Sequence, residues 1–321
     1  MQKIIIVTWW CGFIGSNFLN VFVERFPHIH FVNIDSLTYA GSVDNIEVSI
    51  QNAPNYRFYQ ADIRDISWLR EIYQREKPTD CIHFAAESHV DNSISDPNIF
   101  LETNILGSNN LLLVHQEFGL QRFHFISTDE VYGDLPLDRP DLKFSEDTPL
   151  HPHSPYSSSK ASADMLVQAY QRTYGIDTTI TRCSNNYGPR QHKEKLIPCF
   201  IHKLLEGQKV PLYGDGKNVR DWIHVSDHNE WVWAVFTQAT WWSVYNLWWM
   251  HELSNHDITY KLLYALGKDE NCIDFVPDRK WHDRRYAIDC SKIYRDLWRK
   301  PRYDFEKWLA ETIRWYTMYF S

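Results

Sequence analysis

Short apolar runs alternate with amphipathic segments of helical length through the first 185 residues of this 321-residue chain. The apolar runs predict strands at 3–8, 30–35, 56–60, 80–85, 122–127 and 178–183. The segments between them predict helices at 14–26, 66–76, 98–118 and 157–174. Strands that alternate with helices build a parallel sheet covered by helices. The sequence therefore predicts an α/β fold with a doubly wound parallel sheet.

The pattern becomes irregular after about residue 185. Prolines and glycines break up shorter elements there, as at Pro198, Pro211, Gly214, Pro277 and Pro301. No repeat or low-complexity linker separates the two halves. We expect a Rossmann domain that binds a dinucleotide over residues 1–184. A smaller, mainly substrate-binding lobe is expected over 185–321, with elements interleaved across that boundary.

Composition and charge exclude several classes of function. A net charge of −8 and a pI near 6.0 argue against a nucleic-acid or anionic-membrane surface, because such surfaces need clustered Lys and Arg. The six cysteines form no Cys-x-x-Cys pair and no short ligand spacing. We therefore expect reduced thiols, no metal site and a cytoplasmic protein.

Residues 231–250 carry no charge over twenty positions, which is about the length that spans a bilayer. Polar residues such as Thr237 and Asn246 interrupt the stretch, and tryptophan belongs at membrane interfaces more than at the bilayer centre. We expect a buried helix end, a turn and a strand around 244–247 instead. The N-terminal run has no signal-peptide pattern, so secretion is not expected either.

The first predicted strand leads into a glycine turn. Gly12 and Gly15 hold the spacing of the last two glycines of a dinucleotide fingerprint, where the N–H groups of residues such as Phe13 and Ile14 would receive a pyrophosphate. Twenty residues later the second strand ends in Asp35, which could accept a ribose hydroxyl and would favour NAD over NADP. An ordinary turn aspartate is the alternative for Asp35.

Two further strand ends carry candidates for the same cofactor. The third strand is followed by Asp62 and Ile63, and the fourth by Ala85 and Ala86. Ligands of open parallel sheets bind at the carboxyl ends of strands, and small residues let a ligand approach the backbone. Ordinary packing between helix and sheet is the alternative for the alanine pair.

An acid/base set follows the fifth strand. Thr128, Asp129 and Glu130 stand at its carboxyl end, and Tyr156 and Lys160 lie four residues apart on one face of a predicted helix. A nearby ammonium favours the phenolate and is expected to lower the tyrosine pKa from about 10. Two carboxyl groups in different surroundings can act as acid and base. The alternative for the acidic pair is a turn cap, and Tyr-x-x-x-Lys by itself is a weak pattern.

Later segments offer polar groups for a phosphorylated ligand. Asn185 and Asn186 lie in the run 182–189, and Lys195 and Leu196 follow shortly after. Arg220 and the run 282–286 supply cations that could hold a diphosphate in forked geometry. Within that run we expect the charged side chain of Arg285 to be exposed to solvent.

Together these segments resemble the dTDP-glucose 4,6-dehydratases of the extended short-chain dehydrogenase/reductase superfamily over nearly the whole chain. The resemblance is carried by residues 33–41, 85–91, 127–133, 156–160, 182–189, 195–198 and 211–216. The triplet at 128–130 is the specific feature, because related epimerases and decarboxylases share Tyr-x-x-x-Lys but generally lack the adjacent acidic pair.

The resemblance implies a reaction and roles. Tyr156, helped by Lys160 and Thr128, would take the proton of the sugar 4-hydroxyl while hydride passes to NAD. Glu130 would remove the C5 proton as Asp129 protonates the departing 6-hydroxyl. Hydride then returns to C6, which gives a 4-keto-6-deoxy sugar and regenerates NAD.

The resemblance also implies binding residues and a homodimer. Thr103 and Asn186 join the cofactor residues named above, together with Tyr156 and Lys160. The expected nucleotide-sugar ligands are Ser88, Thr128, Asn185, Lys195, Leu196, Pro211, Tyr213, Arg220, Asn255, His282 and Arg284. Homodimerisation is expected through the helices near 98–118 and 157–174.

The chain departs from the family at several glycines. Tryptophan stands where the family has Gly at Trp9 and Trp10, at Trp248 and Trp249, and at Trp281. The first of these glycines makes a tight turn beside the pyrophosphate, so an indole there would occupy ligand space or push the loop aside.

Two alternatives therefore stay open. One is a UDP-glucose 4,6-dehydratase, because the residues do not choose the base. The other is a catalytically silent scaffold in which Trp9, Trp10 and Trp281 prevent cofactor binding. Trp308 is expected on a surface helix, far from these positions.

Overall fold

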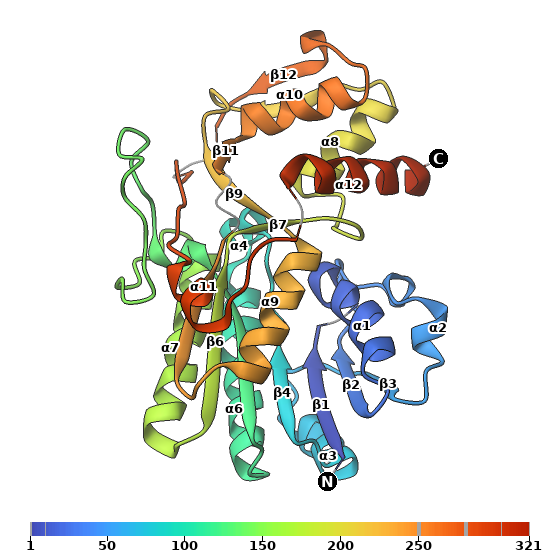
Figure 1. The fold of residues 1–321 in the computed structure, drawn as a ribbon, viewed down its shortest axis with the longest axis vertical. Helices are drawn as coiled ribbons and strands as arrows, with labels where there is room; N and C mark the ends of the chain where they lie inside the picture. The colour runs from blue at the N-terminus through green and yellow to red at the C-terminus, as the bar shows by residue number, and fades with distance from the viewer. Residues whose placement is uncertain (1, 10, 249–251, 279–281, 303, 321) are drawn as a thin grey trace.

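A computed structural model describes residues 2–9, 11–248, 252–278, 282–302 and 304–320. Its centre is a seven-stranded sheet in the order β10-β6-β5-β4-β1-β2-β3, in which all neighbouring strands are parallel (Figure 1). The strands are β1 (Lys3–Thr8), β2 (Ile29–Asp35), β3 (Tyr56–Gln60), β4 (Asp80–His83), β5 (Arg122–Thr128), β6 (Asp177–Cys183) and β10 (Ser243–Leu247). The predicted doubly wound α/β fold is confirmed.

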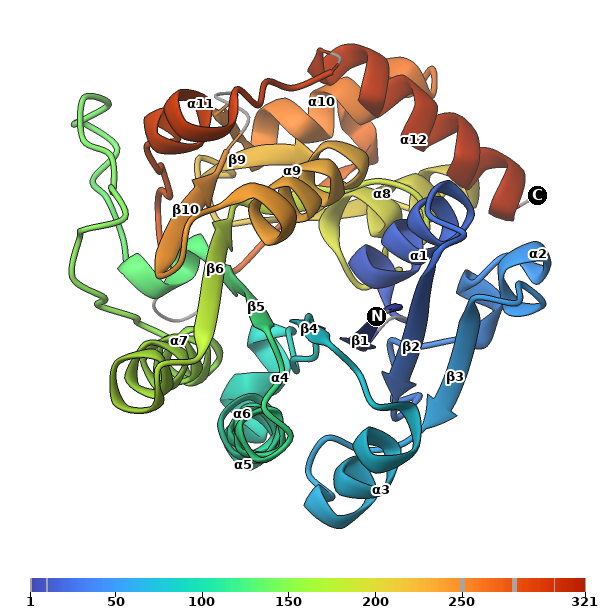
Figure 2. The ribbon, with the colours of Figure 1, turned by 60° about the horizontal axis from the view of Figure 1, so that its bottom comes forward.

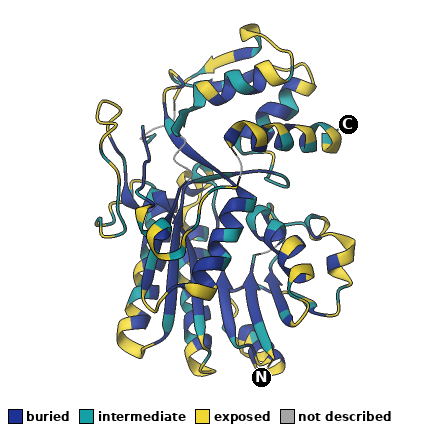
Figure 3. Ribbon diagram, viewed as in Figure 1, coloured by how far each residue is buried: buried dark blue, intermediate teal, exposed yellow. Residues whose placement is uncertain are grey.

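Helices cover both faces of this sheet (Figure 2). One face carries α1 (Phe13–Arg25), α9 (Val225–Gln238) and α11 (Ser291–Leu297), and the other carries α3 (Ile66–Glu76), α6 (Ser108–Glu117) and α7 (Pro155–Tyr174). The central strands are buried on both faces, as Figure 3 shows in dark blue. This explains why they read as continuous apolar runs.

The helix predicted over 98–118 is divided in the structure. It consists of α5 (Pro97–Phe100), the π-helical segment η2 (Leu101–Gly107) and α6. Asn104 lies in the π-helical segment, where its Oδ1 accepts the N–H of Glu87 at 2.8 Å and its Nδ2 donates to the carbonyl oxygen of Glu87 at 3.0 Å. The wider turn thus fixes the loop after β4, in keeping with the occurrence of π-bulges at functional sites.

A second lobe lies above the carboxyl edge of the sheet in Figure 1. It contains a three-stranded sheet and a two-stranded sheet with three helices. These elements are β7 (Asn185–Tyr187), β9 (Val219–His224), β11 (Glu252–Ser254), β8 (Val210–Tyr213), β12 (Ile273–Val276), α8 (Leu196–Leu205), α10 (Asn255–Ala265) and α12 (Phe305–Phe320). Because α9, β10 and α11 return to the large sheet, elements on the C-terminal side of residue 184 belong to both parts.

Short elements complete the chain between these. They are η1 (Val43–Asn45), α2 (Val48–Gln51), α4 (Val90–Ser95), η3 (Asp129–Tyr132) and η4 (Glu270–Cys272). The strand expected around 244–247 is β10, and it follows the end of α9 and a turn. No helix in the described part of the chain combines the length and the apolar character that crossing a membrane requires.

The expectation that Trp308 lies on a surface helix is wrong. Its indole Nε1 donates to Asp227 Oδ2 at 3.0 Å, and its ring stacks on His224 with 3.7 Å between centroids. Trp308 is buried in the apolar cluster of the second lobe. A surface helix was expected at this position, but the sequence did not reveal that the second lobe covers one face of α12.

Candidate active site

The helix that carries Tyr156 and Lys160 begins at a well-defined cap. The Ser154 hydroxyl accepts the N–H of Ser157 at 3.0 Å, and the Ser157 hydroxyl accepts the N–H of Ser154 at 3.0 Å. Pro155 follows as the first helical residue, a position that proline favours. This start places Tyr156 and Lys160 on the buried face of α7, beside the end of β5.

Lys160 is fixed against the strand. Its Nζ donates to the carbonyl oxygen of Ile126 at 2.7 Å and lies 4.1 Å from the centroid of the Phe125 ring. Burial lowers the pKa of Lys160 to about 7. Burial, with the charge of Glu130, raises the pKa of Tyr156 well above its ordinary value, which corrects the expected lowering. The low-dielectric surroundings disfavour the phenolate, and the same burial disfavours the charged form of Lys160 that was expected to favour it.

The two carboxyl groups after β5 lie in different environments. Asp129 is buried, and burial, followed by the charge of Glu130, raises its pKa well above the ordinary value. The Thr128 hydroxyl is 3.3 Å from Asp129 Oδ1 and accepts the N–H of Glu130 at 3.3 Å. Asp129 is thus suited to hold a proton, while Glu130 is less buried and faces the cavities described next.

A cavity of about 220 Å³ brings the predicted catalytic residues together. All five of them line it, as do the turn residues at the start of α1. Of the predicted site residues, it contains Gly12, Phe13, Ile14, Gly15, Ala86, Ser88, Thr128, Asp129, Glu130, Tyr156, Lys160, Asn185, Asn186 and Lys195.

A larger cavity of about 670 Å³ adjoins it under the second lobe. Glu130 and Lys195 line both cavities. The larger one also contains predicted substrate ligands from several elements, namely Ser88, Asn185, Leu196, Pro211, Tyr213, Arg220, Asn255 and His282. Arg220 is oriented by the carbonyl oxygen of Asp283 at 2.9 Å and by the Tyr286 ring, 4.2 Å from its guanidinium.

Two arginines of the run 282–286 do not join this cavity. The guanidinium of Arg284 pairs with Asp215 at 3.0 Å, so the structure does not bring this predicted substrate ligand to the others. Arg285 is not solvated, contrary to its sequence assignment. It is buried, forms an ion pair with Glu252 at 2.6 Å and donates to carbonyl oxygens of the 139–142 loop.

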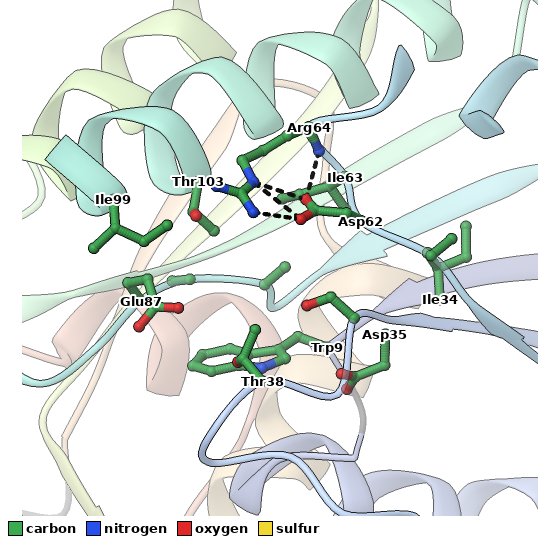
Figure 4. A pocket seen from close by; sticks show the side chains of 14 residues that line it. Trp9, Ile34, Asp35, Thr38, Asp62, Ile63, Arg64, Glu87, Ile99 and Thr103 are labelled. Atoms are coloured by element: carbon green, nitrogen blue, oxygen red, sulfur yellow. Dashed lines mark hydrogen bonds and ion pairs between the residues drawn. The ribbon is translucent and has the colours of Figure 1, made fainter. Parts of the chain in front are cut away.

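The remaining predicted cofactor residues surround a much smaller cavity of about 40 Å³ (Figure 4). They are Asp35, Asp62, Ile63, Ala85 and Thr103, with Ala86 shared. Asp35 accepts the N–H of Cys11 at 2.8 Å and that of Leu37 at 2.7 Å, so it also stabilises the turn after β1. The Trp9 indole lines this cavity, and Figure 4 shows it lying between Asp35 and Glu87.

Several residues that line the large cavity were missed by sequence reasoning. His153 Nδ1 lies 2.9 Å from Asp283 Oδ1, and the Tyr286 hydroxyl donates to Asp283 Oδ2 at 2.5 Å. Trp222 and Glu194 line the cavity as well. Asp283 and Tyr286 lie in the run 282–286, which had been considered for its cations alone, and Glu194 precedes the predicted ligand Lys195.

Comparison with known proteins identifies the family. A family model described as GDP-mannose 4,6 dehydratase matches residues 6–312. A dTDP-glucose 4,6-dehydratase of Streptomyces griseus is 44% identical over 318 residues, covering 98% of this chain and 94% of the relative. The chain belongs to the dTDP-glucose 4,6-dehydratase family.

Solved structures agree with this membership. DesIV, a dTDP-glucose 4,6-dehydratase from Streptomyces venezuelae crystallised with NAD and dTDP, matches with a TM-score of 0.94 at 42% identity, covering 98% of this chain and 97% of that one. A UDP-glucose 4-epimerase of Thermotoga maritima, solved with UDP-glucose, matches with a TM-score of 0.91 at 27% identity, covering 99% and 100%. Dehydratases and epimerases thus share the fold, so the residues of the site must distinguish them.

Among the tryptophans at family glycine positions, Trp9 and Trp248 are described. Trp248 is buried after β10, and Lys143 Nζ lies 4.0 Å from the centroid of its ring. Trp10, Trp249 and Trp281 lie outside the described residues.

Proposed function

We propose that this chain is a dTDP-glucose 4,6-dehydratase, which converts dTDP-glucose to dTDP-4-keto-6-deoxyglucose with loss of water. One observation carries the proposal: a hydroxyl/amine pair and a carboxyl pair line the same 220 Å³ cavity, next to a 670 Å³ cavity lined by cations. The named relatives favour a thymidine nucleotide over the uridine alternative.

The first pair acts on the sugar 4-hydroxyl. Tyr156 takes its proton as the phenolate, with the Thr128 hydroxyl beside it, and the Lys160 ammonium favours that charged form of Tyr156. Burial raises the pKa of Tyr156 in the free protein, so the phenol must release its own proton to solvent before it can accept that of the 4-hydroxyl. NAD, the cofactor of the family, supplies the hydride acceptor at C4 and the donor at C6 when bound. Residues 12–15, Asn186 and Lys160 are the groups that would hold its phosphates and nicotinamide end.

The second pair removes water. Glu130 takes the C5 proton, which a 4-keto group makes acidic, and Asp129 gives its proton to the departing 6-hydroxyl as the C6–O bond breaks. Glu130 later returns a proton to C5. This division follows from the environments, because burial favours the protonated form of Asp129, whereas Glu130 is less buried and lines both cavities.

The nucleotide is assigned to the larger cavity. Arg220, Lys195 and Asn185 offer donors for the diphosphate, and Arg220 is already oriented by Asp283 and Tyr286. Charge-assisted hydrogen bonds to phosphate are among the stronger polar contacts.

A homodimer is part of the proposal. Leu101 and Leu106 on η2 and Met165 on α7 are exposed at 46%, 57% and 54%, on helices that lie side by side. Two copies of this helix pair would bury those side chains in a four-helix bundle. We also assign the protein to the cytoplasm, since each of its six cysteines is free.

The test is turnover of dTDP-glucose and UDP-glucose in parallel, with the products identified by mass spectrometry and NMR. A 4-keto-6-deoxy product, formed without net consumption of NAD and fastest from dTDP-glucose, would support the proposal. A C4 epimer with no loss of water would refute it, because that product needs only the first pair.

A further inference from the structure

The side chain of Trp9 lies in the dinucleotide crevice. Trp9 directly follows β1, has a φ of 60°, and its N–H donates to the carbonyl oxygen of Ile34 at 2.8 Å. A Cβ on Gly12 would lie 3.9 Å and 4.0 Å from two carbons of the indole, Cε2 and Cδ2. The ring therefore packs directly against the glycine turn that opens α1, where a pyrophosphate would bind.

The indole also divides the space of the crevice. Trp9 lines both the 40 Å³ cavity at Asp35 and the 220 Å³ cavity at Tyr156. The smaller volume holds about three water molecules, at roughly 10–15 Å³ each, and a nucleoside is far larger. The catalytic and nucleotide-sugar cavities stay open, so only the adenosine side is filled.

The conformation of Trp9 costs free energy in the backbone and gains free energy from burial of the indole. A non-glycine residue at this φ is unfavourable by roughly 1–2 kcal/mol. Against this, the ring packs on the apolar cluster that contains Ile34, Ile63 and Ala85. An aromatic ring gains considerable free energy from such burial, and leaving the crevice would forfeit it.

We infer that Trp9 is an internal plug of the adenosine half of the cofactor site. NAD binds only to the fraction of molecules in which the indole has left the crevice, and the apparent Kd rises in inverse proportion to that fraction. The inference rests on the proposed function in taking NAD as the ligand, and it adds a determinant of affinity within this chain. Trp9 does not line the nucleotide-sugar cavity, and the catalytic cavity that it does line stays open at about 220 Å³, so the plug acts mainly on the adenosine half.

Titration calorimetry tests this on the cofactor-free 321-residue chain and on two variants of position 9. Trp9→Gly should tighten NAD and ADP-ribose at least tenfold, about 1.4 kcal/mol, and leave nicotinamide mononucleotide unchanged. Trp9→Ala should recover most of the gain, because it frees the space while retaining the unfavourable φ. Trp298→Gly is the matched control: Trp298 also has a positive φ of 53° but is 87% exposed at the end of α11, so NAD affinity should not change.

Two results would refute the inference that Trp9 blocks the adenosine half of the site. One is a parent protein that purifies with stoichiometric NAD and gains less than threefold from Trp9→Gly. Another is an equal gain in Trp298→Gly, which would indicate a general effect of removing an indole. Titration of dTDP is a separate readout. If neither the parent protein nor any variant binds dTDP, the proposed function is refuted. The NAD titrations would still test whether the Trp9 indole blocks the adenosine half of the site.

Discussion

Lys160 Nζ donates a 2.7 Å hydrogen bond to the carbonyl oxygen of Ile126, two residues before Thr128. This bond fixes the register of α7 against the end of β5. Because Tyr156 is one turn before Lys160, and the carboxyl pair follows Thr128, a single contact relates both acid/base pairs to each other. The distance between the groups of the two reaction stages is thereby set by the scaffold and not by loops.

Tyr156→Phe and Glu130→Gln should separate the two stages. The phenylalanine variant loses the group that takes the 4-hydroxyl proton, so NADH should not form in a single turnover with dTDP-glucose. Glu130→Gln should still form NADH and then stall, with dehydration slowed by roughly 10²–10⁴. Absorbance of NADH in the Trp9→Gly background, with cofactor in excess, measures both steps. Equal loss of NADH in the two variants would contradict the role given to Glu130.

Asp129→Asn should lower activity and raise stability at neutral pH. The native pKa of Asp129 lies above its ordinary value of 3.8, so its contribution to stability is complete below pH 4 and is lost as pH rises through the native pKa. Asparagine does not ionise, so it avoids the free-energy cost of a buried carboxylate at neutral pH. The variant should therefore melt at a higher temperature than the parent at pH 7–8, and this advantage should vanish near pH 4.

Thermal unfolding between pH 4 and 8 makes that comparison. Asp138→Asn is the control, because Asp138 is exposed and its replacement should leave the melting profile nearly unchanged. A lower melting temperature for Asp129→Asn across the whole range would show that the carboxylate is ionised and stabilising. Dehydration by the variant should fall by roughly 10²–10⁴.

The positions of strands and helices that depend on local sequence patterns could be predicted from the sequence. The strand ends predicted at 8 and 35 coincide with those of β1 and β2. The strand predicted to end at 127 ends at Thr128, and the helix predicted from 157 begins at Pro155, so local apolar patterns gave these bounds to within two residues. Parallel strands bring their carboxyl ends to one edge, so the catalytic group could be gathered without any knowledge of packing.

Features that depend on tertiary surroundings could not be predicted in this way. Arg285 was assigned to solvent because its partner Glu252 is more than thirty residues away in the sequence, on β11. Trp308 was assigned to the surface because the pattern of a helix does not reveal what covers it. The raised pKa of Tyr156 has the same origin, since spacing gives the neighbour Lys160 but not the burial that opposes it.

Met165→Asp should convert the proposed dimer to a monomer. The side chain is 54% exposed on α7, beside the segment η2 that carries Leu101 and Leu106, so a charge there would be buried between two copies. Sedimentation at micromolar concentration measures the mass. Met318→Asp is the matched control, because Met318 is 68% exposed on α12 in the second lobe and should leave the mass unchanged. A monomeric parent protein would refute the dimer directly.

Trp298→Gly should stabilise the fold by about 1 kcal/mol. Trp298 ends α11 in the left-handed conformation, with a φ of 53°, and its N–H donates to the carbonyl oxygen of Tyr294 at 3.1 Å. Glycine is the preferred residue at such a cap, whereas other L-residues are strained there by roughly 1–2 kcal/mol. The indole is 87% exposed, so its removal forfeits little packing.

Trp298→Ala removes the same indole but keeps the strain, and should match the parent in urea denaturation. If glycine and alanine shift the midpoint equally, the indole and not the backbone sets the stability at this position.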